Sequence, residues 1–304
     1  MLRGTVFAAS GLVFAVFLTF WRQNWLRRRF ATMEEREPLA AEAAASTEKS
    51  KASIAFLGNS IIYYNDTPRL LEALGGGAIV QDSCLRGGVT LGQLLDRGNG
   101  MQAKFVSDDK ASPDVASLLS RAWDFVVMND YTQAPAREVS RNATVEVLTT
   151  RLAPLIAQSG ATPILLETWA YRAHTKGSDD LGDTAAFTEA LRAGYRVYAD
   201  ALAAVLPPQQ QPRVAPVGAA FKAVHAARPE LWHALFHTDG FHPSPLGSYL
   251  EGLVLHATIF GALPPAAVSL PPEPPALWAR ARVMQPADAP PNRFPTRDEM
   301  VYLR

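Results

Sequence analysis

The stretch Ile54-Ala55-Phe56-Leu57-Gly58-Asn59-Ser60 joins a short apolar run to a glycine, an amide and a serine. A bounded apolar run of this length is typical of a buried strand in a parallel sheet. Gly58 permits a tight backbone turn after the strand, so that Ser60 would present its hydroxyl at the edge of the sheet. This junction therefore predicts both a strand and a candidate nucleophile. The alternative is a serine that only caps a turn or a helix.

Further apolar runs alternate with longer amphipathic segments along the chain. We expect strands over residues 53–57, 78–82, 125–128, 163–167 and 213–217. We expect helices over residues 67–74, 91–97, 144–158, 183–206, 219–227 and 244–260. This alternation predicts an α/β fold, a three-layer α/β/α sandwich with a mainly parallel sheet of about five strands. In such sheets the functional groups gather at the carboxyl ends of the strands.

The composition excludes several other classes of protein. Lys+Arg and Asp+Glu both total 29, so no global positive charge favours nucleic acid as a partner. The single cysteine, Cys84, excludes an intrachain disulfide and has no zinc-site spacing around it. His233 and His237 are four residues apart, but no motif completes a metal site, and the Gly75-Gly76-Gly77 run lacks a phosphate-loop lysine. We therefore expect neither a metal nor a cofactor.

The N-terminus predicts a membrane segment. Gly4 to Trp21 is an uncharged, largely apolar run of 18 residues with arginines on both sides, just long enough to span a bilayer as a helix. We expect an uncleaved, single-pass anchor, with a cleaved signal or an organelle-targeting segment as the alternatives. The basic residues after the run favour a cytosolic catalytic domain. The layout of short tail, anchor and stem, with sequons at Asn65 and Asn142, instead favours the lumen of the secretory pathway, such as the Golgi.

Four regions follow from these patterns. Residues 1–30 form the anchor or signal segment with its basic flank, and residues 31–52 form a low-complexity stem that cannot build a core. We expect residues 53–263 to form the main folded domain. Residues 264–304 are a proline-rich extension, which we expect to be extended on the surface and held there by Trp278, Phe294 and Tyr302.

A second candidate group lies far downstream, in Asp239-Gly240-Phe241-His242. An Asp and a His three residues apart in a loop can fold so that the carboxylate accepts a hydrogen bond from one imidazole nitrogen, which leaves the other nitrogen to deprotonate a serine. The alternative is that Asp239 holds the loop, Ser244 caps the following helix and His242 has no catalytic role.

Two further residues would meet Ser60 at the same edge of the sheet. Gly88 follows the second expected strand, and Asn129 ends the third. A bare backbone N–H and a side-chain amide are the donors that a tetrahedral oxyanion needs. A plain glycine turn and a strand-ending Asx turn are the alternatives.

The order Gly58-Asn59-Ser60, Gly88, Asn129-Asp130 and Asp239-Gly240-Phe241-His242 resembles the four blocks of the SGNH (GDSL-like) hydrolase superfamily. The resemblance covers roughly residues 53 to 261 and implies a flavodoxin-like SGNH fold. It implies that Ser60, His242 and Asp239 form a catalytic triad, with an oxyanion hole made by Ser60, Gly88 and Asn129. Asn59 replaces the common Asp of the first block, and Val127 stands where a Gly often precedes the Asn-Asp pair.

The predicted function is that of a serine esterase that hydrolyses an O-acetyl or other short acyl ester of a carbohydrate or small molecule. A membrane-anchored glycan O-acyltransferase with the same site is one alternative. A catalytically silent binding protein that keeps the fold is another. Acyl group, alcohol and oligomeric state are not predicted by the sequence.

Overall fold

A five-stranded parallel sheet forms the centre of the domain in the computed structural model, which describes residues 51–101, 113–172, 178–281, 283 and 293–304. The strands are β1 (Ala52–Gly58), β2 (Ile79–Leu85), β3 (Phe125–Met128), β4 (Thr162–Leu166) and β5 (Arg213–Ala215), in the order β2-β1-β3-β4-β5. All the pairings in this sheet are parallel. The predicted fold class and the five predicted strands are confirmed.

The predicted anchor, Gly4 to Trp21, lies outside the described residues, and so does nearly all of the predicted stem. In the part of the chain that the structure describes, no helix combines the length and the apolar character needed to cross a membrane.

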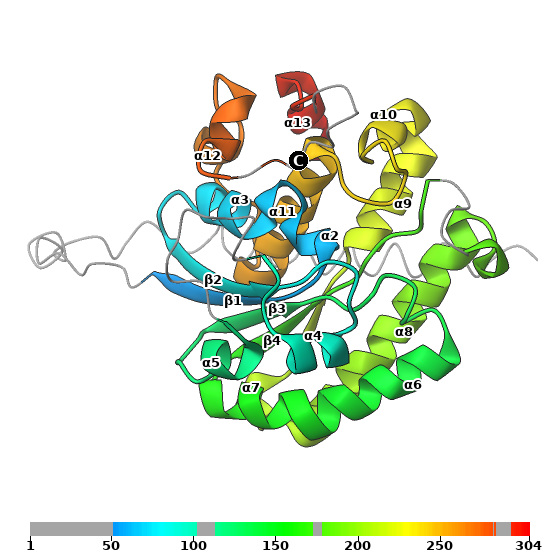
Figure 1. Ribbon diagram of the computed structural model, residues 1–304. Helices are drawn as coiled ribbons and strands as arrows, with labels where there is room; N and C mark the ends of the chain where they lie inside the picture. The colour runs from blue at the N-terminus through cyan, green and yellow to red at the C-terminus, as the bar shows by residue number, and fades with distance from the viewer. Residues whose placement is uncertain (1–50, 102–112, 173–177, 282, 284–292) are drawn as a thin grey trace, which may run out of the picture. The chain divides into compact units, whose positions relative to one another are not determined.

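Helices cover both faces of the sheet (Figure 1). One face packs against α2 (Ser60–Tyr63), α3 (Thr67–Leu74), α9 (Val217–Ala227), α10 (Pro229–Ala234) and α11 (Pro245–Phe260). The other packs against α4 (Leu91–Arg97), α5 (Val115–Leu119), α6 (Glu138–Val147), α7 (Ala153–Ser159) and α8 (Thr184–Val205). The alternation along β1 divides its side chains between the two layers: Ile54 and Phe56 face the first set, Ala55 and Leu57 the second.

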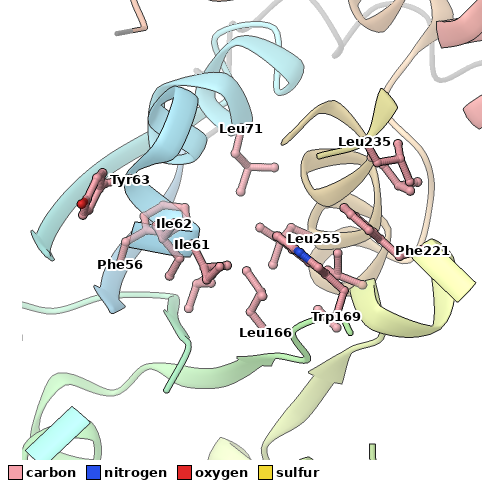
Figure 2. Packing of buried hydrophobic residues seen from close by; sticks show 14 of the residues in the cluster. Phe56, Ile61, Ile62, Tyr63, Leu71, Leu166, Trp169, Phe221, Leu235 and Leu255 are labelled. Atoms are coloured by element: carbon pink, nitrogen blue, oxygen red, sulfur yellow. The ribbon is translucent and has the colours of Figure 1, made fainter. Parts of the chain in front are cut away.

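The first of these cores begins directly after the candidate nucleophile. Ile61 and Ile62 are buried beside Phe56 and Leu71 (Figure 2), while Tyr63 points away from the other labelled side chains. Burying two isoleucines removes apolar surface worth about 1.5–3 kcal/mol each. The segment that carries Ser60 is therefore fastened to the sheet by its own side chains.

Most expected helices are present with similar bounds, but the short helices α5 and α10 were not expected, and two further regions differ. No helix was expected between Ser60 and Thr67, but α2 begins at Ser60 because the Asn59 side chain caps it by accepting a hydrogen bond from the Ile61 N–H at 3.2 Å. The helix expected over residues 144–158 begins earlier, at Glu138, and runs through a π-helical turn, Leu148–Leu152, before α7. Shorter 3₁₀ segments are η1 (Tyr64–Asp66), η3 (Asp179–Leu181) and η4 (Pro208–Gln210).

The proline-rich C-terminal region contains helical turns where extended chain was expected. These are α12 (Ala266–Ser269), η5 (Pro274–Trp278) and α13 (Arg297–Leu303). Prolines stand before α12 and in the first turn of η5, where a missing N–H costs nothing. Trp278 is buried with its ring 5.3 Å from that of Phe294, as expected for residues that hold the region in place, whereas Tyr302 is 41% exposed.

This region closes a third apolar cluster over α3 and α11. The cluster contains the buried side chains of Leu70, Leu74, Tyr249, Leu253, Leu277, Trp278 and Met300. Helix α13 therefore contributes to the core of the domain.

Met300→Ala tests this contribution. Met300 is fully buried, so its truncation should lower the free energy of unfolding by about 2–5 kcal/mol through lost burial and a new cavity. The neighbouring Val301 is 52% exposed, and Val301→Ala should change stability by less than about 0.5 kcal/mol. Urea unfolding of both variants measures the difference; equal effects would contradict the packing of α13.

Candidate active site

Ser60, Gly88 and His242 line one cavity of about 160 Å³. They come from three distant parts of the chain: Ser60 follows β1, Gly88 follows β2, and His242 precedes α11. Other lining residues are Asn59, Ile61, Tyr63, Gly87, Tyr131, Thr132, Tyr171 and Phe241. Parallel strands deliver their carboxyl ends to one edge of the sheet, and the cavity lies at that edge.

Two buried amides join the ends of β1 and β3. The Asn59 N–H donates to Asn129 Oδ1 at 3.2 Å, and Asn129 Nδ2 donates to Asn59 Oδ1 at 2.9 Å. Asn129 Nδ2 also donates to the Asp130 carbonyl at 2.9 Å, and Asn59 Nδ2 donates to the Val89 carbonyl at 3.0 Å. A backbone N–H can only donate a hydrogen bond and a backbone carbonyl can only accept one. These bonds therefore fix the positions of the oxygen and the nitrogen in both side-chain amides. Both hydrogens of Asn129 Nδ2 are thus used inside the protein.

Gly58 is required by this amide pair. A Cβ atom at Gly58 would lie 2.0 Å from Asn129 Oδ1 and 2.9 Å from Ile62 Cδ1. The reason for the glycine is therefore the close approach of Asn129, rather than the tight turn expected from the sequence. Gly88, by contrast, has a φ of +69°, a conformation that glycine adopts without strain.

Asp130 follows Asn129 but serves the opposite layer. Its buried carboxylate accepts hydrogen bonds from the Leu91 and Tyr131 N–H groups and from the hydroxyls of Thr144 and Tyr198. Burial raises the pKa of Asp130, and these donors oppose the shift. Asn129 does not line the cavity but bonds Asn59 beside it, and Asp130 connects α4, α6 and α8.

Asp239 and His242 form the pair that the sequence predicts. Asp239 Oδ2 lies 2.7 Å from His242 Nδ1, while Asp239 Oδ1 accepts from the N–H groups of Phe241 and His242 at 3.0 Å each. Burial alone would raise the pKa of Asp239, but the hydrogen bonds from His242 and the backbone outweigh it and hold that pKa well below its usual value. The carboxylate is therefore ionised and holds His242 with Nε2 on the other side of the ring.

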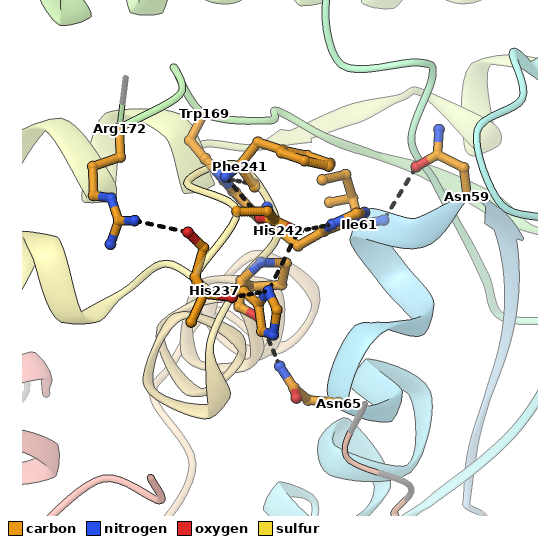
Figure 3. A network of polar contacts seen from close by, with 11 residues as sticks. Asn59, Ile61, Asn65, Trp169, Arg172, His237, Phe241 and His242 are labelled. Atoms are coloured by element: carbon orange, nitrogen blue, oxygen red, sulfur yellow. Dashed lines mark hydrogen bonds and ion pairs between the residues drawn. The ribbon is translucent and has the colours of Figure 1, made fainter. Parts of the chain in front are cut away.

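The loop that carries Asp239 and His242 is held by hydrogen bonds between its two ends and by hydrogen bonds from residues outside it (Figure 3). Phe236 and Pro243 form an antiparallel bridge, and the His237 N–H donates to the His242 carbonyl at 2.8 Å. Trp169 Nε1 donates to the Phe241 carbonyl at 3.0 Å, and Arg172 Nη2 donates to that of Thr238 at 3.1 Å. These bonds fix the position of the imidazole relative to the sheet.

His237 is a second imidazole at the same carboxylate, and it was not predicted as part of the site. Its Nδ1 lies 3.3 Å from Asp239 Oδ2, and the side chain is buried. From the sequence, His237 was considered only as a possible metal ligand together with His233. The signal that could have found it is the loop itself, since His237 stands two residues before Asp239 in a segment that must turn sharply at Gly240, where φ is +79°.

Tyr63 is a second residue that the sequence did not assign to the site's chemistry. Burial raises its pKa, and a hydrogen bond with the Ser60 side chain opposes that shift. Its hydroxyl also lies beside Gly87, where a Cβ would meet it at 2.8 Å.

Within the described ranges, no group of three or more His, Cys, Asp or Glu side chains is arranged to hold a metal ion.

Comparisons place this architecture among solved structures. No protein-family model matches the chain, and no curated protein matches it. The chain is similar to a DUF4886 family protein from Bacteroides uniformis, with 15% identity and a TM-score of 0.55 over 70% of this chain and 84% of that one. It is also similar to a protein from Slackia heliotrinireducens provisionally named an SGNH hydrolase, with 28% identity and a TM-score of 0.49 over 69% of this chain and all of that one.

A phospholipase A1 from Streptomyces albidoflavus matches more distantly, with 14% identity and a TM-score of 0.36 over 69% of this chain and all of that one. The sheet order, and the placement of Ser60, Gly88 and Asn129 after strand ends with His242 in the loop before α11, agree with the SGNH resemblance of the sequence. The chain has an SGNH hydrolase-like fold. At these identities the solved structures show the fold alone, so the chemistry of this SGNH-like site is argued below from its residues.

Gly58→Ala should destabilise the SGNH-like domain by about 1–3 kcal/mol, because the new methyl group overlaps Asn129 Oδ1. In the double variant Gly58→Ala/Asn129→Ala the overlap is relieved, so the total cost should be smaller than the sum of the two single costs. Chemical unfolding of the three variants measures this coupling. Additive costs would contradict the close approach.

Asp239→Asn should weaken the fold in a pH-dependent way. A carboxyl whose pKa is depressed in the folded state contributes stability above its unfolded pKa, about 3.9, and this contribution is lost as the pH falls through the folded pKa. The stability advantage of the wild type over Asp239→Asn should therefore be full above about pH 4 and shrink below it. Unfolding curves between pH 2 and pH 7 provide the measurement, and an advantage that grows on acidification would contradict it.

Proposed function

We propose that this protein is a serine esterase. The observation that carries the proposal is the shared cavity of Ser60 and His242, with His242 Nδ1 held 2.7 Å from the ionised Asp239. A serine becomes a nucleophile when an oriented imidazole can take its proton, and a carboxylate on the far nitrogen fixes the tautomer that does so. The SGNH-like fold agrees with this chemistry, though it does not by itself establish it.

In the proposed reaction, His242 Nε2 takes the Ser60 proton as Ser60 Oγ bonds to the acyl carbon. The resulting oxyanion is stabilised by the backbone N–H groups of Ser60 and Gly88. His242 then gives the proton to the leaving alcohol as the ester C–O bond breaks. Water attacks the acyl-enzyme with His242 again as base, which releases the carboxylic acid and restores Ser60.

Asn129 has a more restricted part in this scheme. Its Nδ2 hydrogens are engaged with Asn59 Oδ1 and the Asp130 carbonyl, so it reaches an oxyanion only by sharing one of them. Its larger contribution is to hold the Asn59 N–H, and through it the backbone next to Ser60.

The cavity favours a small, neutral ester. Among the described residues that line it there is no Lys, Arg, Asp or Glu, so nothing there compensates a charged acyl group or a phosphate. Its volume of about 160 Å³ is well below the ~300–1,000 Å³ typical of sites for drug-sized ligands. We therefore propose an acetyl or similarly short acyl group as the part of the substrate that enters.

The aromatic side chains of the cavity indicate what kind of alcohol the ester substrate contains. Tyr63, Tyr131, Tyr171 and Phe241 line the cavity, and such rings offer flat apolar faces with hydroxyl groups at their edges. A carbohydrate ring presents C–H faces and hydroxyls that suit this lining. The proposed substrate class is an O-acetylated carbohydrate or a similar neutral ester.

Ser60→Ala should abolish hydrolysis of p-nitrophenyl acetate, with a loss of at least about 1,000-fold in kcat. A fluorophosphonate probe should label the wild type and not the variant. Ser120→Ala is the matched control, since the Ser120 hydroxyl is exposed and bonds only its own helix turn, and it should keep full activity. Undiminished hydrolysis by Ser60→Ala would overturn the proposal.

The substrate proposal has its own test. kcat/KM should fall as the acyl chain of the p-nitrophenyl ester lengthens from acetyl to octanoyl, and acetylated xylose should release acetate. Adding a free sugar as acceptor distinguishes hydrolysis from acyl transfer, because a transferase would form a new sugar ester. A preference for octanoyl esters would contradict the short-acyl assignment.

A further inference from the structure

Tyr64 stacks directly on the imidazole of His242. The two ring centroids are 3.8 Å apart and the planes differ by 5°, so the rings are parallel and in contact. Tyr64 lies four residues after Ser60, which is about one helical turn. The short segment that carries the nucleophile therefore also carries a ring that covers one face of the candidate base.

Asn65, the next residue, joins the same two segments by hydrogen bonds. Its Nδ2 donates to the Pro243 carbonyl at 2.9 Å and to Ser248 Oγ at 3.0 Å, and Pro243 directly follows His242. Figure 3 shows Asn65 extending from its segment toward the loop of His237 and His242. Ser248 Oγ in turn lies 3.4 Å from the Tyr64 carbonyl.

The backbone here has a strained conformation. Asn65 and Asp66 have φ values of 56° and 57°, a left-handed conformation that is unfavourable for residues other than glycine. Such a turn persists only where surrounding contacts over-determine it. Those contacts are the Asn65 bonds to Pro243 and Ser248 and the 2.7 Å ion pair between Asp66 and Arg69.

The stack acts on the imidazole in two ways. Rotation of the His242 ring about its Cβ–Cγ bond would break the parallel contact, so the stack opposes any departure from the plane that points Nδ1 at Asp239. The face of an aromatic ring carries negative potential, so it also favours the imidazolium formed when His242 takes a proton. Phe241, whose centroid is 3.9 Å from that of His242 at a tilt of 42°, adds a further ring contact.

We propose that Tyr64 is a positioning residue for His242, and that the Tyr64–Asn65 turn sets the geometry between the nucleophile segment and the base. This inference rests on the proposed serine esterase function. The ring face carries the effect, and the Tyr64 hydroxyl is not needed for it.

Tyr64→Leu keeps an apolar side chain but removes the aromatic ring, whereas Tyr64→Phe keeps the ring and removes only the hydroxyl. Comparing the two variants shows whether the ring itself is needed. For Tyr64→Leu we expect kcat for p-nitrophenyl acetate to fall about tenfold or more with KM changed less than about twofold. Tyr64→Phe should stay within about twofold of the wild type in both constants. Equal kcat values for Tyr64→Leu and the wild type would overturn the inference.

Two further variants test whether a general loss of stability could explain the lower kcat of Tyr64→Leu. Tyr249→Leu removes a buried tyrosine from the third apolar cluster, away from the cavity, and should lower the melting temperature without lowering kcat at 25 °C. Asn65→Gly keeps the positive φ but removes the bonds to Pro243 and Ser248, and should lower kcat as Tyr64→Leu does. A drop in kcat for Tyr249→Leu as large as that for Tyr64→Leu would refute a specific positioning role.

An NMR measurement tests the stack without catalysis. The Hε1 resonance of His242, assigned by its absence in His242→Asn, should be shifted by the ring current of Tyr64 in the wild type and in Tyr64→Phe. It should move in Tyr64→Leu. If the wild type has no esterase activity and Ser60 is not labelled, the proposed function fails, and an unmoved His242 resonance separately refutes the stack. If Ser60→Ala is inactive while Tyr64→Leu has full kcat, only the positioning role fails.

Discussion

The reciprocal hydrogen bonds between Asn59 and Asn129 are the constraint on which the nucleophile segment of the site depends. They lie at the ends of two neighbouring parallel strands, and every polar atom of both amides has a partner. A buried amide network of this kind is stable only when it is complete, because each unpaired group would cost about 1–3 kcal/mol. Gly58 is a consequence of this network, since any side chain there would collide with Asn129.

From this fixed point the nucleophile segment extends in a defined direction. The Asn59 side chain caps the helical turn that starts at Ser60, and Ile61 and Ile62 bury themselves in the core below it. Ser60 is left at the surface of the cavity, because its neighbours supply both the cap and the apolar anchoring. A substitution of Asn59 by Asp, the residue common in the SGNH blocks, would keep the cap acceptor but lose the donor to the Val89 carbonyl.

The base is held by an independent structure, the closed loop between Phe236 and Pro243. Its local bonds orient His242 against Asp239, and the Tyr64 ring and the Asn65 amide connect it to the nucleophile segment. The two halves of the site are thus joined by the stack of Tyr64 on His242 and by the hydrogen bonds of Asn65. His237, at the same carboxylate, makes Asp239 the meeting point of two imidazoles.

The sequence by itself determined the sheet and indicated the candidate groups of the site. Apolar runs of strand length mark all five strands, and the Asp239–His242 pair is predictable because its partners are three residues apart and bond through a local loop. The helical turn at Ser60 was missed because its cap, Asn59, also belongs to a network with Asn129, 70 residues away. The C-terminal helical turns were missed because proline was taken as a breaker, while Pro265 precedes α12 and Pro274 and Pro275 stand in the first turn of η5, positions that helices accept.

Only the tertiary structure decided how these groups meet. No periodic or local pattern in the chain predicts the stack of Tyr64 on His242 or the bond from Asn65 to Pro243 across 178 positions of sequence. They arise when the sheet brings distant strand ends to one edge. The sequence thus determines which residues can react, and the contacts between its remote segments decide their geometry, because that geometry depends on packing rather than on spacing along the chain.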